Sequence, residues 1–245
     1  MRMWVEILFN IAYLIVIWGL VITMILLKDR VASENRKSTS LVIWAFALLA
    51  LGDTGHVGFR VLAYSMGGLE SRVQFLGMNI GLVGIGALST AITVTIFYIL
   101  MLELWRVHFK QRYGWFEYLL IASAIFRLAL MILPANHWDS VVPPQPWSIW
   151  RNLPLTLIGL GVAYLMLRDA RRTHDRTFQW IGISILVSYA CYIPVILFVQ
   201  QVPSIGMLMI PKTLAYVAVG FLAYHDFYQT NRVPQQTNSI KAMEA

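Results

Sequence analysis

The chain has 245 residues, of which 58% are hydrophobic and only 13% are charged. A soluble domain usually carries about 25% charged residues, so this composition excludes an ordinary soluble domain and favours an integral membrane protein. The formal net charge is +7, but the basic residues lie in clusters between apolar runs, which is typical of membrane topology and not of nucleic-acid binding. The single cysteine, Cys191, excludes an intrachain disulfide, and no Cys/His spacing predicts a metal site.

Seven apolar runs are long enough to cross a membrane. They predict an all-α integral membrane protein whose residues 1–228 form a seven-transmembrane-helix bundle. The predicted spans cover residues 4–27, 41–66, 76–102, 115–134, 152–168, 178–200 and 204–226. Residues 229–245 are polar and are predicted to be a disordered cytoplasmic tail.

The basic residues predict how these spans are oriented. The connections after spans one, three and five, together with the tail, hold 13 Lys and Arg residues, whereas the opposite side holds 3. Cytoplasmic connections carry the excess of positive charge, so the N-terminus is predicted outside and the C-terminus in the cytoplasm. We expect a multi-pass protein of the plasma or inner membrane, with the lipid bilayer as its constant partner.

The second span carries the densest group of polar residues at membrane depth. Asp53, His56 and Arg60 follow one another at spacings of three and four residues, so a helix places them on one face. Asp53 is twelve residues into the span, which is ~18 Å at ~1.5 Å per residue and close to the middle of a ~30 Å hydrocarbon layer. A carboxylate at that depth is costly unless it is paired or hydrated, so this face is expected to border a functional interior. The alternative is a buried ion pair that only fixes helix packing.

The third and fourth spans flank this face in different ways. Small residues, including Gly77 and Gly81, predict that the third span is a central, tightly packed helix. The hydroxyl groups of Thr90 and Thr93 are expected to bond back to their own helix and not to form a site. The fourth span contains Arg127 twelve residues in, again near the midplane. Because Asp53 is the only acid predicted at that depth, a contact between Asp53 and Arg127 is the natural inference.

The remaining spans are defined by prolines and capping residues. The loop at 134–150 contains a proline-rich segment, Pro143–Pro146, that is predicted to be extended. Asn152 is a good N-cap, with Pro154 in the first turn, so the fifth span is predicted to begin there. The seventh span contains Lys212, with Tyr216 one turn further on.

These positions predict a polar pocket that opens toward the outside. The cations are expected to outnumber the acids in it, which favours an anionic ligand or an acidic lipid headgroup. The alternative is that Arg60 and Lys212 extend to the outer headgroups without forming a pocket. The predicted ligand-binding residues are Glu6, Asn10, Asp53, His56, Arg60, Arg127, Lys212 and Tyr216.

Two functions of different classes fit such a pocket. The first is a receptor-like or sensory protein that binds a small acidic or amphipathic molecule and signals through a cytoplasmic partner at the basic loops. The second is an intramembrane hydrolase in which Asp53 orients His56 as a general base. A metal is not expected, because only one histidine is at membrane depth. A small-molecule transporter is a less favoured alternative.

A third alternative comes from topology. Seven spans with an external N-terminus and a lysine in the last span resemble the microbial rhodopsins, and this resemblance implies retinal bound to Lys212. That family places an acidic counter-ion in the third span, where this chain has none. We therefore predict no cofactor.

Overall fold

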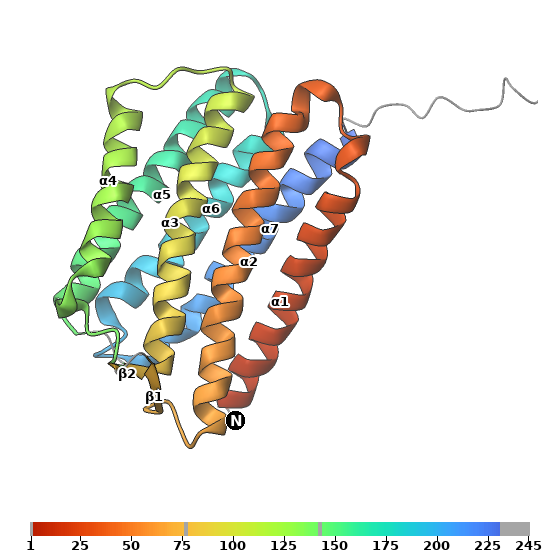
Figure 1. The fold of residues 1–245 in the computed structure, drawn as a ribbon. Coiled ribbons are helices and arrows are strands. Elements are labelled where there is room, and N and C mark those ends of the chain that lie inside the picture. The colour runs from red at the N-terminus through yellow and green to blue at the C-terminus, as the bar shows by residue number, and fades with distance from the viewer. Residues whose placement is uncertain (1, 76–77, 142–143, 231–245) are drawn as a thin grey trace, which may run out of the picture.

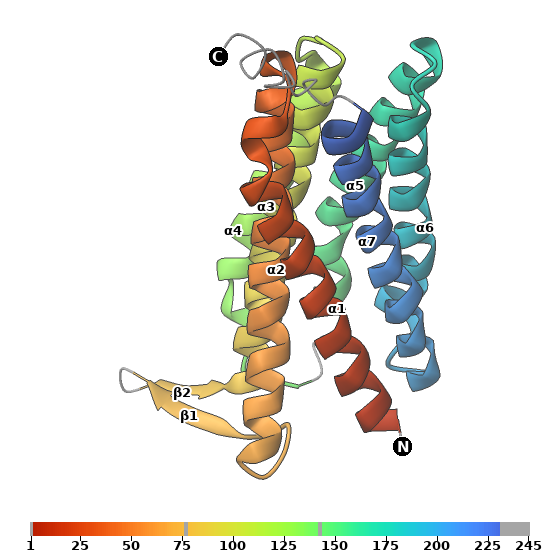
Figure 2. The same ribbon diagram turned by 90° about the vertical axis from the view of Figure 1, so that its right-hand side faces the viewer.

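The computed structural model describes residues 2–75, 78–141 and 144–230. Seven helices within this part are long and apolar enough to span a membrane, as predicted from the sequence. Figures 1 and 2 show them side by side as an elongated bundle. Their bounds are α1 Arg2–Leu26, α2 Arg36–Ser65, α3 Leu82–His108, α4 Trp115–Ile132, α5 Trp147–Arg172, α6 Arg176–Phe198 and α7 Met209–His225. Shorter turns are η1 Lys28–Arg30, η2 Ser33–Asn35, η3 Pro134–Asn136, η4 Pro203–Leu208 and η5 Asp226–Thr230.

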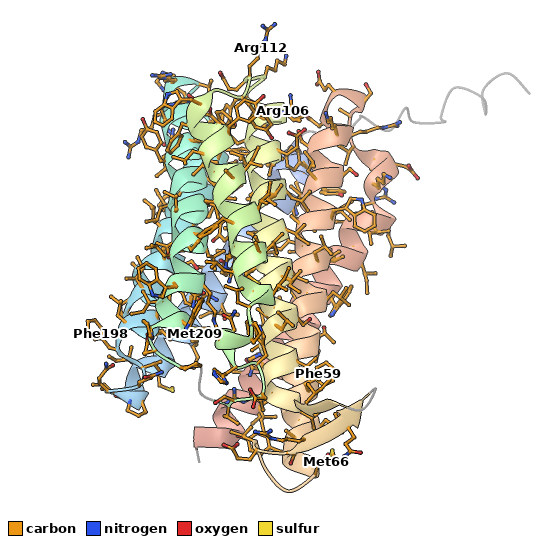
Figure 3. The ribbon with its side chains drawn as sticks, turned by 60° about the vertical axis from the view of Figure 1, so that its left-hand side comes forward. Phe59, Met66, Arg106, Arg112, Phe198 and Met209 are labelled. Carbon is orange, nitrogen blue, oxygen red and sulfur yellow. The ribbon has the colours of Figure 1, made fainter. Side chains whose placement is uncertain are left out.

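The two ends of the bundle differ in composition. Figure 3 shows Arg106 and Arg112 at one end and Phe59, Met66 and Met209 at the other. We call the first the basic end, because it holds the α1–α2, α3–α4 and α5–α6 connections with their Lys and Arg residues. We call the other the pocket end. Which end faces the cytoplasm stays a prediction.

A β-hairpin precedes α3, where the sequence predicted that the third span begins at residue 76. The antiparallel strands β1 (Arg72–Phe75) and β2 (Met78–Gly81) pair Val73 with Ile80, and α3 begins only at Leu82. The stretch from Arg72 to Phe75 alternates polar and apolar residues, which is the period of a strand and not of a helix. The chain is therefore not entirely helical, and Gly81 lies in a strand and not in a helix interface. Figure 2 shows the hairpin projecting from the bundle.

The fifth span also begins earlier than predicted. The helix α5 starts at Trp147, so Asn152 is not an N-cap and Pro154 lies inside the helix. The first turn is already closed before Asn152, because the Ser148 N–H donates to the Pro144 carbonyl and the Trp150 N–H to the Pro146 carbonyl. Because of this extra turn, Arg151 and Asn152 lie within α5 and not before it or at its cap.

Helices α2 and α3 pack very closely. A Cβ on Gly52 would clash with the Thr93 side chain, and one on Gly86 would lie 3.0 Å from the His56 Cα. Only glycine allows the two backbones to approach this far. Because of this contact, the polar face of α2 lies against the first turns of α3.

An aromatic layer closes the middle of the bundle. The rings of Phe46 and Phe97 meet edge to face with centroids 5.5 Å apart, and Phe97 makes the same contact with Tyr216. The hydroxyl groups of Tyr98 and Tyr216 are hydrogen-bonded at 2.7 Å. Tyr216 is at once a member of this layer and a lining residue of the cavity described next.

Candidate functional site

A cavity of about 630 Å³ lies between the helices on the pocket-end side of the aromatic layer. Its lining runs from Trp138 and the η4 residues Pro203 and Met207 down to Val94 and Tyr216. Seven of the residues predicted for the site line it: Asn10, Asp53, His56, Arg60, Arg127, Lys212 and Tyr216. The eighth, Glu6, lies in α1, and its side chain is outside the part of the chain that the structure describes.

One wall of the cavity is built around Asp53 on α2. The Tyr13 hydroxyl donates to Asp53 Oδ2 at 2.7 Å, and the Thr90 hydroxyl donates to Asp53 Oδ1 at 3.3 Å. The Thr90 Oγ1 atom also lies 3.0 Å from the Gly52 carbonyl oxygen. Thr93 bonds back to the Ser89 carbonyl of its own helix, as predicted, whereas Thr90 bonds to α2. No local pattern distinguishes the two threonines.

The opposite wall contains Arg127 on α4, whose side chain is 2% exposed. Its Nε donates to the Arg151 carbonyl at 2.9 Å, and its Nη1 donates to the Ala91 carbonyl at 2.6 Å and to the Thr95 hydroxyl. Its Nη2 lies 3.5 Å from Asn152 Oδ1. The guanidinium is therefore held by carbonyl and hydroxyl dipoles from α3 and α5.

The predicted contact between Asp53 and Arg127 is not formed. Their depths do match, because Asp53 bonds to Thr90 and Arg127 bonds to its neighbour Ala91. Figure 1 shows α3 standing between α2 and α4. Successive residues of a helix point about 100° apart, so Asp53 and Arg127 approach α3 from different sides. Asp53 and Arg127 therefore lie at the same level of α3 without contacting each other.

Lys212 and Arg151 complete the second wall. The Lys212 Nζ lies 4.6 Å from the ring centroid of Tyr192 and 5.4 Å from that of Tyr216. The Arg151 guanidinium lies over the Trp138 ring, with Cζ 4.4 Å from the centroid. Among the described residues, neither cation is within 4 Å of a carboxylate oxygen.

Arg151 and Asn152 are site residues that sequence reasoning missed. The fifth span was predicted to begin at Asn152, so Arg151 lay outside it and Asn152 was interpreted as a helix cap. Asn152 instead accepts from the Tyr192 hydroxyl at 3.0 Å and donates to the Ser148 carbonyl at 2.8 Å. It thereby ties α6 to α5 beside Arg151.

His56 lines the cavity, but its contacts do not make it a general base oriented by Asp53. No hydrogen bond joins the two side chains, and the hydrogen bonds of Asp53 within the described chain come from Tyr13 and Thr90. The His56 Nδ1 atom is buried and has no hydrogen-bond partner among the residues with described side chains. No group of three or more His, Cys, Asp or Glu residues in the described chain could hold a metal ion.

The rest of the lining is mostly apolar and includes Phe9, Leu49, Val57, Leu155, Val195 and Ile210. The cavity thus offers an acid–hydroxyl wall from α1, α2 and α3, on which Arg60 also lies, a cationic wall from α4, α5 and α7, and aliphatic surface between them. Comparison with known proteins found no matching family model, no matching curated protein and no matching solved structure.

Proposed function

We propose that this protein is a receptor-like or sensory membrane protein that binds a small acidic or amphipathic molecule, or an acidic lipid headgroup, in the cavity at the pocket end. The observation that carries this proposal is the charge of the lining. Arg60, Arg127, Arg151 and Lys212 line a cavity whose described acidic lining residue is Asp53. A confined site lined by one sign of charge attracts the opposite charge.

Arg127, Arg151 and Lys212 lack a close carboxylate partner among the described residues, and this supports an anionic ligand in particular. Buried cations that lack a carboxylate partner are costly, and a bound anion would supply that partner. A ligand that binds only the folded state also stabilises that state by mass action.

The size and polarity of the cavity support an amphipathic ligand. Pockets for small molecules usually measure about 300–1,000 Å³ and combine an apolar lining with a few polar groups. The cavity, at about 630 Å³, falls in this range and has aliphatic as well as cationic surface. An acid with an apolar body would match both kinds of surface, whereas a bare inorganic anion would leave the aliphatic surface uncovered.

The hydrolase alternative has less support, because it needs a carboxylate–imidazole contact between Asp53 and His56. Output from a receptor would require a cytoplasmic partner. The exposed basic loops are where we expect it to bind.

The test compares three ligands with the same tail: decanoate, decanol and decylamine. Protein in phosphatidylcholine nanodiscs is heated with each ligand, and unfolding is followed by intrinsic tryptophan fluorescence. Decanoate should stabilise the protein by about 2.7 kcal/mol at a concentration of 100 Kd, whereas the alcohol and the amine should not. Equal shifts with all three ligands would indicate simple partitioning into the bilayer and would end the proposal. A second arm replaces part of the phosphatidylcholine with phosphatidylglycerol, and decanoate binding that disappears there would identify a lipid headgroup as the occupant.

A further inference from the structure

We infer that Lys212 and Arg151 form the subsite that binds the anionic headgroup of the ligand, and that Arg127 positions this subsite without binding the ligand itself. The inference rests on the proposed function and assigns roles to three of the four described Lys and Arg residues that line the cavity. It follows from how the hydrogen-bond donors of each cation are used.

Four of the five N–H donors of Arg127 are already engaged. Each of its three guanidinium nitrogens has an acceptor within the protein: the Arg151 carbonyl, the Ala91 carbonyl with the Thr95 hydroxyl, and Asn152 Oδ1. A ligand that used more than the one remaining Nη2 donor would have to break bonds that join α4 to α3 and α5. Arg127 therefore acts on the ligand through the backbone of Arg151, which it holds in place.

The hydrogen-bond donors of Lys212, in contrast, are unused within the described chain. Its ammonium lies over the rings of Tyr192 and Tyr216 and makes no hydrogen bond to a described residue. An ammonium group has three donors, and the aromatic rings offer it only a weak electrostatic attraction. The unused donors belong to a residue that lines the cavity, so an oxyanion there would gain charge-assisted hydrogen bonds.

The Arg151 side chain has the same property. Its guanidinium lies over Trp138 and makes no side-chain hydrogen bond to a described residue, while its carbonyl is held by Arg127. A stacked guanidinium presents its planar edge, which matches the two oxygens of a carboxylate or phosphate. The two cations are brought to the same corner by Tyr192, whose ring lies under Lys212 and whose hydroxyl bonds to Asn152, the neighbour of Arg151.

The position of this corner also orients the ligand. Lys212 is three residues after the start of α7 and Arg151 four residues after the start of α5, so both lie about one helical turn, ~5 Å, inside the pocket-end helix termini. Leu49, Val94 and Leu155 line the cavity nearer the middle of their helices. The headgroup therefore lies near the mouth, and the apolar tail points toward the aromatic layer.

The experiment measures the Kd of decanoate and of decyl phosphate for the full chain in phosphatidylcholine nanodiscs by calorimetry. The variants are Lys212→Met, Arg151→Gln and the double variant. Arg72→Gln is the matched control, because Arg72 is a cation on the hairpin at the same end that is paired with Asp139 at 3.5 Å and does not line the cavity. Loss of one charge-assisted partner should weaken binding about ten-fold or more. The double variant should lose less than the product of the two single losses, because both groups bind one oxyanion, and Arg72→Gln should stay within about two-fold.

Arg127→Lys tests the positioning role. It keeps the charge but cannot reach the same acceptors, so it should lower the Tm of the unliganded protein and still bind decanoate more tightly than Arg151→Gln does. The reverse order of affinities would overturn the assignment. If Lys212→Met does not fold, Arg151→Gln alone tests the headgroup subsite. Arg151 is only partly buried, so its replacement is expected to leave the fold intact.

The two proposals fail in different ways. Absence of binding of both amphiphiles to the wild type, in both lipid compositions, would overturn the proposed function. Wild-type binding that Lys212→Met and Arg151→Gln leave within two-fold would overturn the headgroup subsite alone. Tighter binding of decyl phosphate than decanoate would assign the subsite to phosphate monoesters, and the opposite order to carboxylates, and either result supports the subsite.

Discussion

Asp169, Glu103 and Asp175 at the basic end and the charged residues of the cavity are satisfied in opposite ways. At the basic end, Asp169 is 3% exposed and is surrounded by donors: Trp105 Nε1 at 2.9 Å, Arg168 at 2.7 Å and Arg172 at 3.5 Å. Glu103 and Asp175 likewise lie against Arg106 and His108. Every one of these acids has a basic partner within the protein.

In the cavity, the same types of residue avoid one another. Asp53 bonds to hydroxyl groups, Arg127 to carbonyls and a hydroxyl, and Lys212 and Arg151 lie on aromatic rings. A structural ion pair satisfies its own charges and offers nothing to a ligand. Lys212 and Asp53 do attract each other across the cavity, but charges that form no close ion pair keep part of their field available. The ion pairs at the basic end stabilise the fold, whereas the cavity charges are available to bind a ligand. Variants at each end can test this distinction.

The first prediction fixes which end faces the cytoplasm and has an all-or-none outcome. A reporter fused after Ala245 should be active in the cytoplasm, and one inserted after Gln145 should be active outside, because 13 of the Lys and Arg residues lie on the predicted cytoplasmic side and 3 on the other. Paired reporters that are active only on opposite sides of the membrane provide the measurement. The reverse pattern would make the cavity open to the cytoplasm.

The second prediction concerns the basic end. Asp169→Asn should lower the free energy of unfolding by about 3 kcal/mol, because it removes the buried carboxylate that accepts from Trp105 and Arg168. Thermal unfolding in detergent measures the effect. Asp29→Asn is the matched control, since Asp29 is exposed at the same end and forms no ion pair with a described residue. A loss no greater than in this control would mean that the ion pairs there do not hold the fold.

The third prediction concerns Asp53 and Arg127, which share a level of α3 but do not touch. Arg127→Gln should cost about 2 kcal/mol through its lost contacts to α3 and α5, and Asp53→Asn about 1 kcal/mol, because an amide can still accept from Tyr13. The two losses should add within about 0.5 kcal/mol in the double variant. Recovery of more than about 1 kcal/mol in the double variant would show that the two charges are coupled after all.

This pair also shows what the sequence could and could not predict. The apolar runs identified seven spans, because length and hydropathy are local properties. The depth of Asp53 and Arg127 could also be counted from the sequence. Which side of α3 each residue approaches depends on the packing of α2 and α4, and no local pattern encodes it.

The missed site residues have a similar cause. Arg151 and Asn152 belong to the cavity because the turn at Pro144 and Pro146 starts α5 five residues before the predicted N-cap. An asparagine followed by a proline two residues later has the pattern of a helix start, and only the tertiary contact with Tyr192 shows its real role. Local propensity predicted the wrong start for α5, and packing determines where the helix begins.

The fourth prediction uses pH at the basic end. Asp175 lies between α5 and α6, where burial alone would raise the pKa of its carboxyl, but hydrogen bonds from His108 at 2.8 Å and from the Phe178 N–H at 2.9 Å lower it below the ordinary value. A carboxyl whose pKa is lower in the folded state contributes stability above its unfolded pKa, and that contribution is lost as the pH falls through the folded value.

Stability should therefore decline below about pH 4 in the wild type, and Asp175→Asn should flatten this decline. The variant should cost only about 0.5–1 kcal/mol at pH 7, because asparagine is as good an N-cap as aspartate and only the charge is lost. Unfolding in detergent across pH 3–7 provides the measurement. An unchanged decline would assign the acid sensitivity to another carboxyl.

The fifth prediction expects no effect and distinguishes ionic from covalent use of Lys212. A retinal Schiff base would require Lys212 to act as an amine nucleophile, whereas the headgroup subsite requires it as a charged ammonium. Its Nζ lies over the rings of Tyr192 and Tyr216, which stabilise a cation. Purified protein incubated with all-trans retinal should therefore develop no new absorption band in the visible range. A band that appears in the wild type and vanishes in Lys212→Ala, while Arg72→Gln keeps it, would show that Lys212 forms a covalent bond and would replace the anion in the cavity with a chromophore.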